Sequence, residues 1–217
     1  MKIVSLFLVS VLVLAARDAP AHAVVQPRMA IETPLTLLAR EARTVSWADQ
    51  LAPLEVDNVV TGSGASIRLY ASGGDVDDTA RMQLEHVVAR DGEQHVLEVR
   101  LEQLVVKAAY HFKGARVLVV SGWREHAGRH TTGEALDFKL QGVRAATLAA
   151  YLRGLARVGV GVYTHPRTQY VHLDVREPSY HWIDGSPPGV TWKESQLRDP
   201  WAWKRDAAWT PVSDLPL

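Results

Sequence analysis

Histidine and aspartate side chains gather in one stretch of the chain, which contains His126, His130, Asp137, His165, His172 and Asp174. Two histidines and one aspartate that converge make a zinc site with an open fourth position, where water can bind. Zinc lowers the pKa of that water, which is what a hydrolytic site requires. Iron and manganese accept the same ligand types. A histidine beside a strand can instead be an ordinary hydrogen-bonded residue.

Strands must position most of these side chains. The segment around His172 alternates between apolar and polar residues, which predicts a strand with His172 and Asp174 on the same face. His130 lies just before a glycine turn, and the strand predicted after that turn contains Asp137. The imidazoles and the carboxylate can therefore converge on one face of a sheet.

The remaining pattern predicts an α+β fold. Apolar and alternating runs predict strands at residues 54–60, 66–71, 115–120, 135–140, 158–163 and 170–175. Apolar residues at helical spacing predict helices at residues 77–89, 98–112 and 143–155. The connections are too short for a run of βαβ crossovers, so we expect a small, mainly antiparallel sheet flanked by helices.

The composition limits the class of protein. The chain has 217 residues and a mass of 24.0 kDa, which suffices for one domain with appendages or two very small domains. Hydrophobic residues make up 47% and charged residues 22%, which excludes a disordered chain. Basic and acidic residues balance at 24 each, so we expect no nucleic acid partner. The absence of cysteine excludes disulfides, cysteine catalysis and thiolate metal sites.

The N-terminus has the pattern of a secretory signal peptide. An apolar run from Ile3 to Ala16 is too short for a comfortable membrane span, and the small-residue pattern Ala21-His22-Ala23 follows it. We expect cleavage after residue 23; the alternative is an uncleaved signal anchor. We expect an exported monomer in the periplasm or cell envelope, without stable membrane insertion. Residues 24–64 would form an N-terminal arm before a domain at 65–177.

The C-terminal segment, residues 178–217, is rich in tryptophan. It contains Trp182, Trp192, Trp201, Trp203 and Trp209. Tryptophan is a large apolar anchor, so we expect the segment to wrap back and pack these indoles on the domain. The alternative is an aromatic platform for sugar rings.

Four short motifs follow one another along the chain. They are Ser121-Gly122-Trp123-Arg124, His130-x-x-Gly133-x-Ala135-x-Asp137, Gly159-Val160-Gly161-Val162-Tyr163 and Tyr170-Val171-His172-Leu173-Asp174. Together they resemble the zinc D-alanyl-D-alanine peptidase superfamily, which includes the hedgehog fold, and within it the MepK murein endopeptidases. The resemblance covers about residues 79–174 and implies the fold expected above.

The resemblance also implies roles for individual residues. His130, Asp137 and His172 would be the ligands of Zn²⁺. Arg124 would lie at the cleft and bind a carbonyl or carboxylate of the substrate, a task that suits its planar guanidinium group. The alternative for Arg124 is a surface ion pair of little energetic weight.

The sequence departs from the family pattern at three points. Arg124 and His130 are six positions apart, whereas many relatives have a longer substrate loop there. Trp123 replaces the usual tyrosine. Some branches carry an acidic or histidine base two or three residues before the last ligand, where this chain has Gln169 and Tyr170.

Asp174 is then the best candidate for the catalytic base, because it shares a strand face with His172. It is an equally good candidate for a carboxylate that orients a ligand imidazole. His126 and His165 are candidates for placing the substrate or donating to an oxyanion.

The resemblance and the signal peptide predict an exported zinc metallopeptidase that hydrolyses stem or cross-link peptides of peptidoglycan, as an endopeptidase or a carboxypeptidase. A carboxylate would activate water, and zinc with Arg124 would stabilise the oxyanion. The missing upstream base favours one alternative, a catalytically silent, zinc-bearing protein that binds the cell wall. A structural envelope protein, in which these side chains only form hydrogen bonds, is the second alternative.

Overall fold

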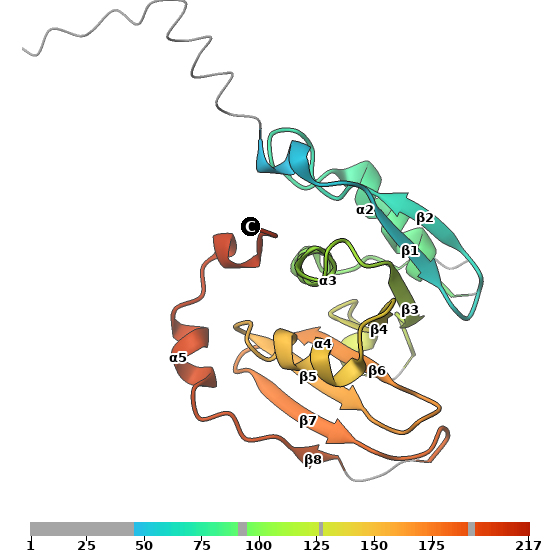
Figure 1. Ribbon diagram of the computed structural model, residues 1–217, viewed down its shortest axis with the longest axis vertical. Coiled ribbons are helices and arrows are strands. Elements are labelled where there is room, and N and C mark those ends of the chain that lie inside the picture. Colours follow the sequence, from blue (N-terminus) through green and yellow to red (C-terminus); the bar gives the residue numbers. More distant parts are fainter. Residues whose placement is uncertain (1–45, 91–94, 126–127, 191–193) are drawn as a thin grey trace, which may run out of the picture. The chain divides into compact units, whose positions relative to one another are not determined.

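The computed structural model describes residues 46–90, 95–125, 128–190 and 194–217 (Figure 1). The expected signal peptide and residues 24–45 of the expected arm lie outside the described residues. Among the described residues, none of the helices combines the length and the apolar character needed to cross a membrane.

Eight strands form one sheet. They are β1 (Leu54–Asn58), β2 (Gly64–Ile67), β3 (Val117–Ser121), β4 (Ala135–Leu140), β5 (Val158–Tyr163), β6 (Tyr170–Val175), β7 (Tyr180–Asp184) and β8 (Ser195–Gln196). Their order across the sheet is β2-β1-β3-β4-β6-β5-β7-β8. The β1–β3 and β5–β7 pairs are parallel, and the other five pairs are antiparallel. The expected α+β fold with a mainly antiparallel sheet is therefore confirmed.

The 3₁₀ turns are η1 (Trp47–Gln50), η2 (Gly128–His130) and η3 (Pro211–Asp214). Three α-helices lie where helical spacing predicts them: α2 (Asp78–Val88), α3 (Val99–His111) and α4 (Ala145–Leu152). A further α-helix, α5 (Ala202–Ala207), lies in the C-terminal segment, where no helix was predicted. Carboxylates cap two of them: Asp77 accepts from the N–H of Ala80 at the start of α2, and Glu98 accepts from that of Leu101 at the start of α3.

The hydrophobic core lies between the central strands and the helices α3 and α4. Because side chains alternate along a strand, Leu136, Leu173 and Val160 face one side of the sheet, where all three are buried. Leu101 of α3 and Leu148 of α4 belong to the same core. Asp137 of β4 and His172 of β6 therefore lie on the opposite face of the sheet.

The strand observed near residues 66–71 is shorter than the predicted strand and begins two residues before it. It is β2, which ends at Ile67, because Ile67 pairs with Leu54, the first residue of β1. Beyond that point the neighbouring strand offers no further partner. Tyr70 instead forms an isolated bridge with Val76.

Strand β7 comes from the segment expected only to wrap around the domain, and it extends the sheet beside β5. The indoles of that segment divide into two groups. Trp182 is buried, and Trp209 lies beneath the guanidinium groups of Arg100 and Arg157. Trp201 and Trp203 are 64% and 69% exposed. The fifth indole, at position 192, lies outside the described residues.

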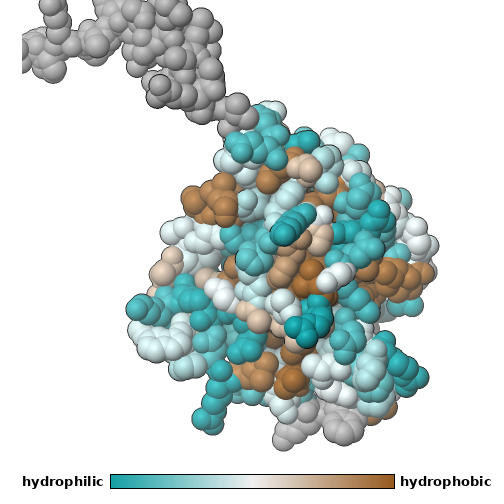
Figure 2. Space-filling view, in the orientation of Figure 1, coloured by the Kyte–Doolittle hydropathy of each residue, from teal (hydrophilic) through white to brown (hydrophobic). Residues whose placement is uncertain are grey.

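The surface in Figure 2 mixes the two kinds of residue. Hydrophobic residues lie in separate patches divided by hydrophilic ones on the face in view. Among the described residues on that face, no single large apolar patch of the kind that marks a stable interface is seen.

Two buried carboxylates anchor the C-terminal segment. Asp206 accepts hydrogen bonds from the backbone N–H of Arg157 (2.6 Å) and from the backbone N–H and hydroxyl of Ser179 (2.8 and 2.7 Å). Asp214 accepts from Arg100 Nε (2.7 Å) and Trp209 Nε1 (2.8 Å).

Replacing Asp206 by alanine should destabilise the protein by about 2–3 kcal/mol, because it leaves partly buried N–H groups without an acceptor. At this chain length that loss corresponds to a fall in Tm of roughly 5–10 °C. Thermal unfolding followed by circular dichroism measures it. The control is Asp57→Ala, which removes a more exposed ion pair with Arg116 and should cost less than about 1 kcal/mol. Equal Tm values for the two variants would contradict an anchoring role for Asp206.

Candidate metal centre

The candidate site is built on the central pair of strands. Asp137 of β4 lies directly opposite His172 of β6 in the antiparallel register. His130 comes from η2, just before β4. The turn between them contains Gly133 in the left-handed region (φ +74°), where a Cβ atom would lie 2.1 Å from the Val96 carbonyl oxygen. Only glycine fits this turn, which returns the chain to β4 with His130 beside Asp137.

Three candidate ligand atoms converge in the sheet. His172 Nδ1 lies 2.8 Å from Asp137 Oδ1 and 3.1 Å from His130 Nε2, and His130 Nε2 lies 3.5 Å from Asp137 Oδ1. All three side chains are buried. Ligand atoms bound tetrahedrally at about 2.0–2.1 Å from zinc lie roughly 3.3 Å apart. The spacing of the three atoms therefore fits a metal ion of this size, and their chemistry fits zinc.

Both imidazoles are held so that the correct nitrogen faces the cluster. His130 Nδ1 lies 2.6 Å from the Gly122 carbonyl oxygen and must donate to it, so in the neutral ring Nε2 carries the lone pair. His172 Nε2 lies 3.1 Å from Asp174 Oδ2; when it donates there, the neutral ring directs the Nδ1 lone pair at the cluster. Partners of this kind fix the tautomer and the ring orientation of metal ligands.

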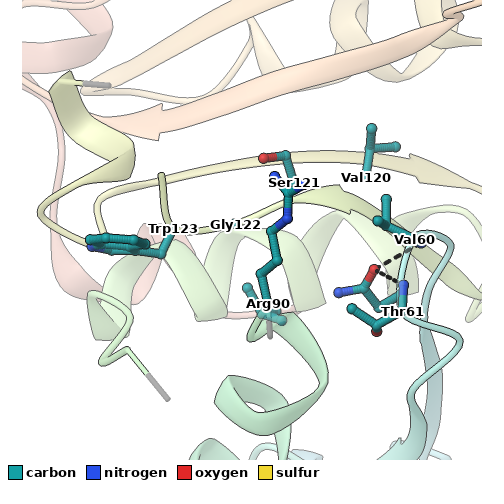
Figure 3. Close-up of a pocket in the computed structure, with 9 residues that line it drawn as sticks. Val60, Thr61, Arg90, Val120, Ser121, Gly122 and Trp123 are labelled. Atoms are coloured by element: carbon teal, nitrogen blue, oxygen red, sulfur yellow. Dashed lines mark hydrogen bonds between the residues drawn. The ribbon is translucent and has the colours of Figure 1, made fainter. Parts of the chain in front are cut away.

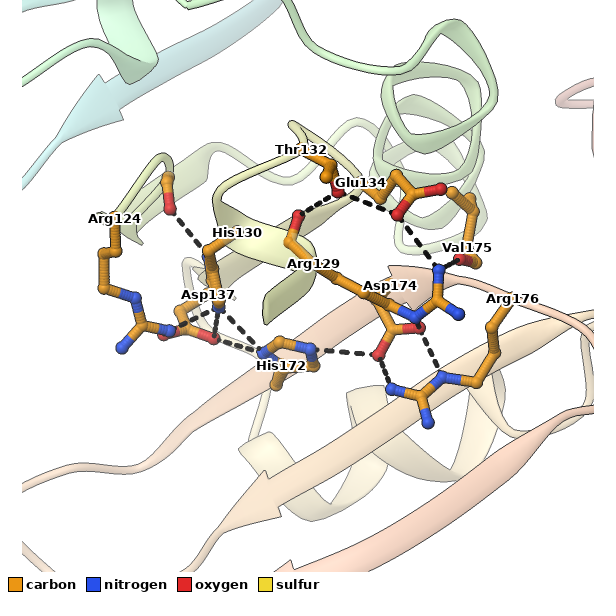
Figure 4. A network of polar contacts seen from close by, with 11 residues as sticks. Arg124, Arg129, His130, Thr132, Glu134, Asp137, His172, Asp174, Val175 and Arg176 are labelled. Atoms are coloured by element: carbon orange, nitrogen blue, oxygen red, sulfur yellow. Dashed lines mark hydrogen bonds and ion pairs between the residues drawn. The ribbon is translucent and has the colours of Figure 1, made fainter. Parts of the chain in front are cut away.

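Arg124 and Asp174 lie at opposite ends of the cluster (Figure 4). Arg124 Nη2 lies 2.9 Å from Asp137 Oδ2 and also contacts His130 Nε2. Its side chain is 40% exposed. The guanidinium group therefore reaches both the cluster and the solvent.

Electrostatics couple Asp137 and His172. Burial alone would raise the pKa of Asp137, but hydrogen bonds from His130 and His172 hold it well below its usual range. Burial alone would lower the pKa of His172, but hydrogen bonds with Asp137 and Asp174 raise it to about 8. Without a metal, the cluster thus combines an ionised carboxylate with an imidazole that is mostly protonated at neutral pH.

Asp174 is fully buried, on the side of His172 away from the other ligands. Nε and Nη2 of Arg176 each donate to one oxygen of its carboxylate, and Arg129 Nε lies 3.5 Å from Oδ1. Burial would raise the pKa of Asp174, but hydrogen bonds from His172 and Arg176 lower it. Arg176 was not among the residues predicted from the sequence, although strand alternation places it on the face of His172 and Asp174.

The remaining candidates lie apart from the cluster or outside the described residues. His165 is in the turn between β5 and β6, where its Nδ1 accepts from the backbone N–H of Arg167, and it does not join the three ligands. His126 lies outside the described residues. Tyr170 stacks on Tyr163, with ring centroids 4.3 Å apart. Burial and the negative charge of Asp137 raise the pKa of Tyr170 to about 12, so its phenol stays protonated.

Two further features beside the cluster were not found from the sequence. Trp182 of β7 lies 5.1 Å from His172 between ring centroids, a contact that follows from the pairing of β7 with β5. A cavity of about 130 Å³ lies next to the motif Ser121-Gly122-Trp123 (Figure 3). Arg90 and Thr61 also line it. Gly122 lines the cavity as well, and its carbonyl oxygen is the hydrogen-bond partner of His130 Nδ1.

Comparison with known proteins identifies the family. The family model described as "Peptidoglycan L,D-endopeptidase MepK" matches residues 46–182, well over half of the chain. The chain is 36% identical over 53 residues to the peptidoglycan L,D-endopeptidases MepK of Escherichia coli (strain K12) and Shigella flexneri. The aligned segment covers 24% of this chain and 28% of each relative. No solved structure matches the chain. The extent of the family match shows that the chain belongs to the MepK family of peptidoglycan L,D-endopeptidases.

Proposed function

We propose that this chain is a zinc metallopeptidase that hydrolyses L,D-peptide bonds in the stem or cross-link peptides of peptidoglycan. One observation carries the proposal: two buried imidazoles and one buried carboxylate place their ligand atoms within 3.5 Å of one another. Family membership and the names of the relatives support the choice of substrate. An exported protein that acts in the cell envelope, as the signal peptide pattern predicts, would meet this substrate.

The ligands would be His130 Nε2, Asp137 and His172 Nδ1. Zinc held there supplies a Lewis acid that makes water a better nucleophile and polarises a peptide carbonyl. With the metal bound, the carbonyl oxygen of Gly122 and the carboxylate of Asp174 would accept from the remaining N–H of His130 and His172. Among the described donors of the cluster only Asp137 is anionic, which leaves a bound divalent cation with a net positive charge.

Arg124 would bind the substrate. Its guanidinium contacts Asp137 and His130 yet is partly exposed, so it can donate to a carbonyl or carboxylate that enters from solvent. His165, in the turn after β5, is proposed as a contact for a part of the substrate further from the ligands. His126 stays a proposal of the same kind.

Asp174 would orient His172 rather than act as the catalytic base. Its carboxylate is fully buried and engaged by His172 and Arg176. A general base must reach the proton that it removes, and His172 stands between Asp174 and the other two ligands. This arrangement, with Gln169 and Tyr170 at the family's upstream base positions, favours the second candidate function, a zinc-bearing binding protein without hydrolytic activity.

Two measurements on the mature protein test the proposal. Elemental analysis should give about one zinc per chain. Incubation with cross-linked muropeptides, followed by chromatography and mass spectrometry, should release products that a chelator suppresses and added zinc restores. Binding of the muropeptides without cleavage would establish the silent alternative, and the absence of a bound metal after reconstitution would refute both.

The zinc affinity should depend on pH through His172. Its pKa in the metal-free protein is about 8, and the imidazole must give up a proton before Nδ1 can bind a metal. Below about pH 8 the apparent Kd for zinc should therefore rise roughly tenfold per pH unit, and above it this group imposes no further change. Competition with a chromophoric chelator, corrected for the protonation of the chelator itself, measures the dependence. A constant Kd between about pH 6 and pH 8 would contradict it.

A further inference from the structure

Arg176 follows directly after β6, and its side chain lies on the same face of the sheet as His172 and Asp174. His172 and Asp174 alternate along the strand, and Arg176 follows at the next alternate position. The backbone N–H of Arg176 bonds to the Arg157 carbonyl, so the chain keeps its direction past the end of the strand. Figure 4 shows the resulting row, in which Asp174 lies between the His172 imidazole and the Arg176 guanidinium.

A gap in the neighbouring strand makes room for this pair. Gly159 of β5 lies directly opposite Asp174. A Cβ atom at residue 159 would lie 2.1 Å from Asp174 Oδ2 and 2.5 Å from Arg176 Nε. The carboxylate and guanidinium groups thus lie over the β5 backbone, and any side chain at this position would displace them.

The guanidinium of Arg176 is itself held in place. It lies 5.6 Å from the ring centroids of both Tyr180 and Trp182 on β7, a distance at which a cation is attracted to an aromatic face. Its side chain is 23% exposed. Arg176 is therefore fixed between the aromatic residues of β7 and the carboxylate of Asp174.

The geometry of the contact determines how Asp174 lies. Nε and Nη2 of Arg176 each donate to a different oxygen of Asp174, which fixes the plane of the carboxylate as well as its position. In that plane Oδ2 accepts from both Arg176 and His172 Nε2. Arg129 approaches only Oδ1, at 3.5 Å, and also bonds to Glu134 and the Val175 carbonyl.

We propose that Arg176 is a positioning residue of the metal centre: through its two-point contact it fixes Asp174, which in turn holds His172 with Nδ1 directed at the metal. Gly159 is the second part of this device, because its missing side chain gives the contact its space. The inference rests on the metal centre of the proposed function. Lysine, a point charge, would attract Asp174 but would not fix its plane.

The test compares Arg176→Gln and Arg176→Lys with the wild type and with Arg116→Gln, which removes an arginine from an exposed ion pair with Asp57. The first readout is the Kd for zinc, measured by chelator competition. The second is the ¹⁵N chemical shift of His172 Nε2 in the zinc-free protein, which reports the hydrogen bond between Nε2 and Asp174 Oδ2.

We expect Arg176→Gln to raise the Kd for zinc about tenfold, the lower end of the range for partners of metal ligands. The Nε2 chemical shift of its His172 should move away from the wild-type value, because Asp174 no longer has a fixed position as the partner of Nε2. Arg176→Lys should lie between the two, and Arg116→Gln should match the wild type. A wild-type Kd and an unchanged Nε2 shift of His172 in Arg176→Gln would overturn the proposal.

Two outcomes need separate treatment. If Arg176→Gln does not fold, the Lys variant decides, because a purely structural arginine would leave the Nε2 shift of His172 unchanged in a folded Lys variant. If the wild type binds no zinc, the proposed function fails. The Nε2 shifts of the zinc-free proteins then still support or overturn the role of Arg176.

Discussion

Replacing His130, Asp137 or His172 by alanine should in each case reduce the zinc content of the purified protein from about one ion per chain to near zero and abolish peptide hydrolysis. The reason is the number of ligands: a catalytic zinc is held by three protein groups, and two do not retain it. Elemental analysis and a muropeptide digest on the same preparations measure both effects. Full zinc retention in all three variants would show that the ligands lie elsewhere.

The three variants should still fold. The ligands lie on or just before strands whose other face packs Leu136 and Leu173 against the core, so the sheet has its own source of stability. Far-ultraviolet circular dichroism should therefore be unchanged, and zinc removal should lower only the Tm, by the lost binding free energy. His86→Ala, at an exposed histidine of α2, is the matched control and should keep its zinc.

Replacing Asp174 by asparagine should weaken zinc binding by about 10–100-fold. An asparagine amide can turn its NH₂ group toward His172 Nε2, which then becomes the acceptor and places the imidazole proton on Nδ1, the atom that must bind the metal. Turnover measured at saturating zinc should change much less than the affinity does. Chelator competition and zinc-saturated kinetics on one preparation separate the two effects.

A catalytic base at this position would give the opposite result. Its loss would reduce turnover by about 10²–10⁴-fold while leaving the zinc affinity intact. Unchanged affinity together with unchanged turnover would exclude both roles for Asp174. Because asparagine also leaves Arg176 facing a neutral group, thermal unfolding of the variant must accompany these measurements.

The part of the fold that carries the ligands could be predicted from the sequence. The bounds of β4, β5 and β6 agree with the apolar and alternating patterns, because these strands are buried and their alternate apolar residues face the core. His130, Asp137 and His172 lie together as the motifs imply. The short spacing within one motif places His130 beside Asp137, whereas His172 joins them through the pairing of β4 with β6.

The rest depends on contacts between segments distant in sequence. The local pattern of residues 180–184 does not indicate that they pair in parallel with β5. Neither β7 nor the position of Trp182 beside His172 was therefore predicted. The strand β1 was predicted, but its pairing with β3, which it joins from within the segment expected to be an arm, was not. The two-point contact of Arg176 depends on an empty space over Gly159, which becomes visible only in the paired strands.

The register of β4 against β6 has a consequence for the order of events in folding. Asp137 and His172 are 35 residues apart in sequence and become neighbours only when these two strands pair. Before that, the chain offers a metal no more than two of the three ligands at close range. Zinc held at the proposed site would therefore bind after the central strands have assembled, so it would slow unfolding and leave the folding rate unchanged.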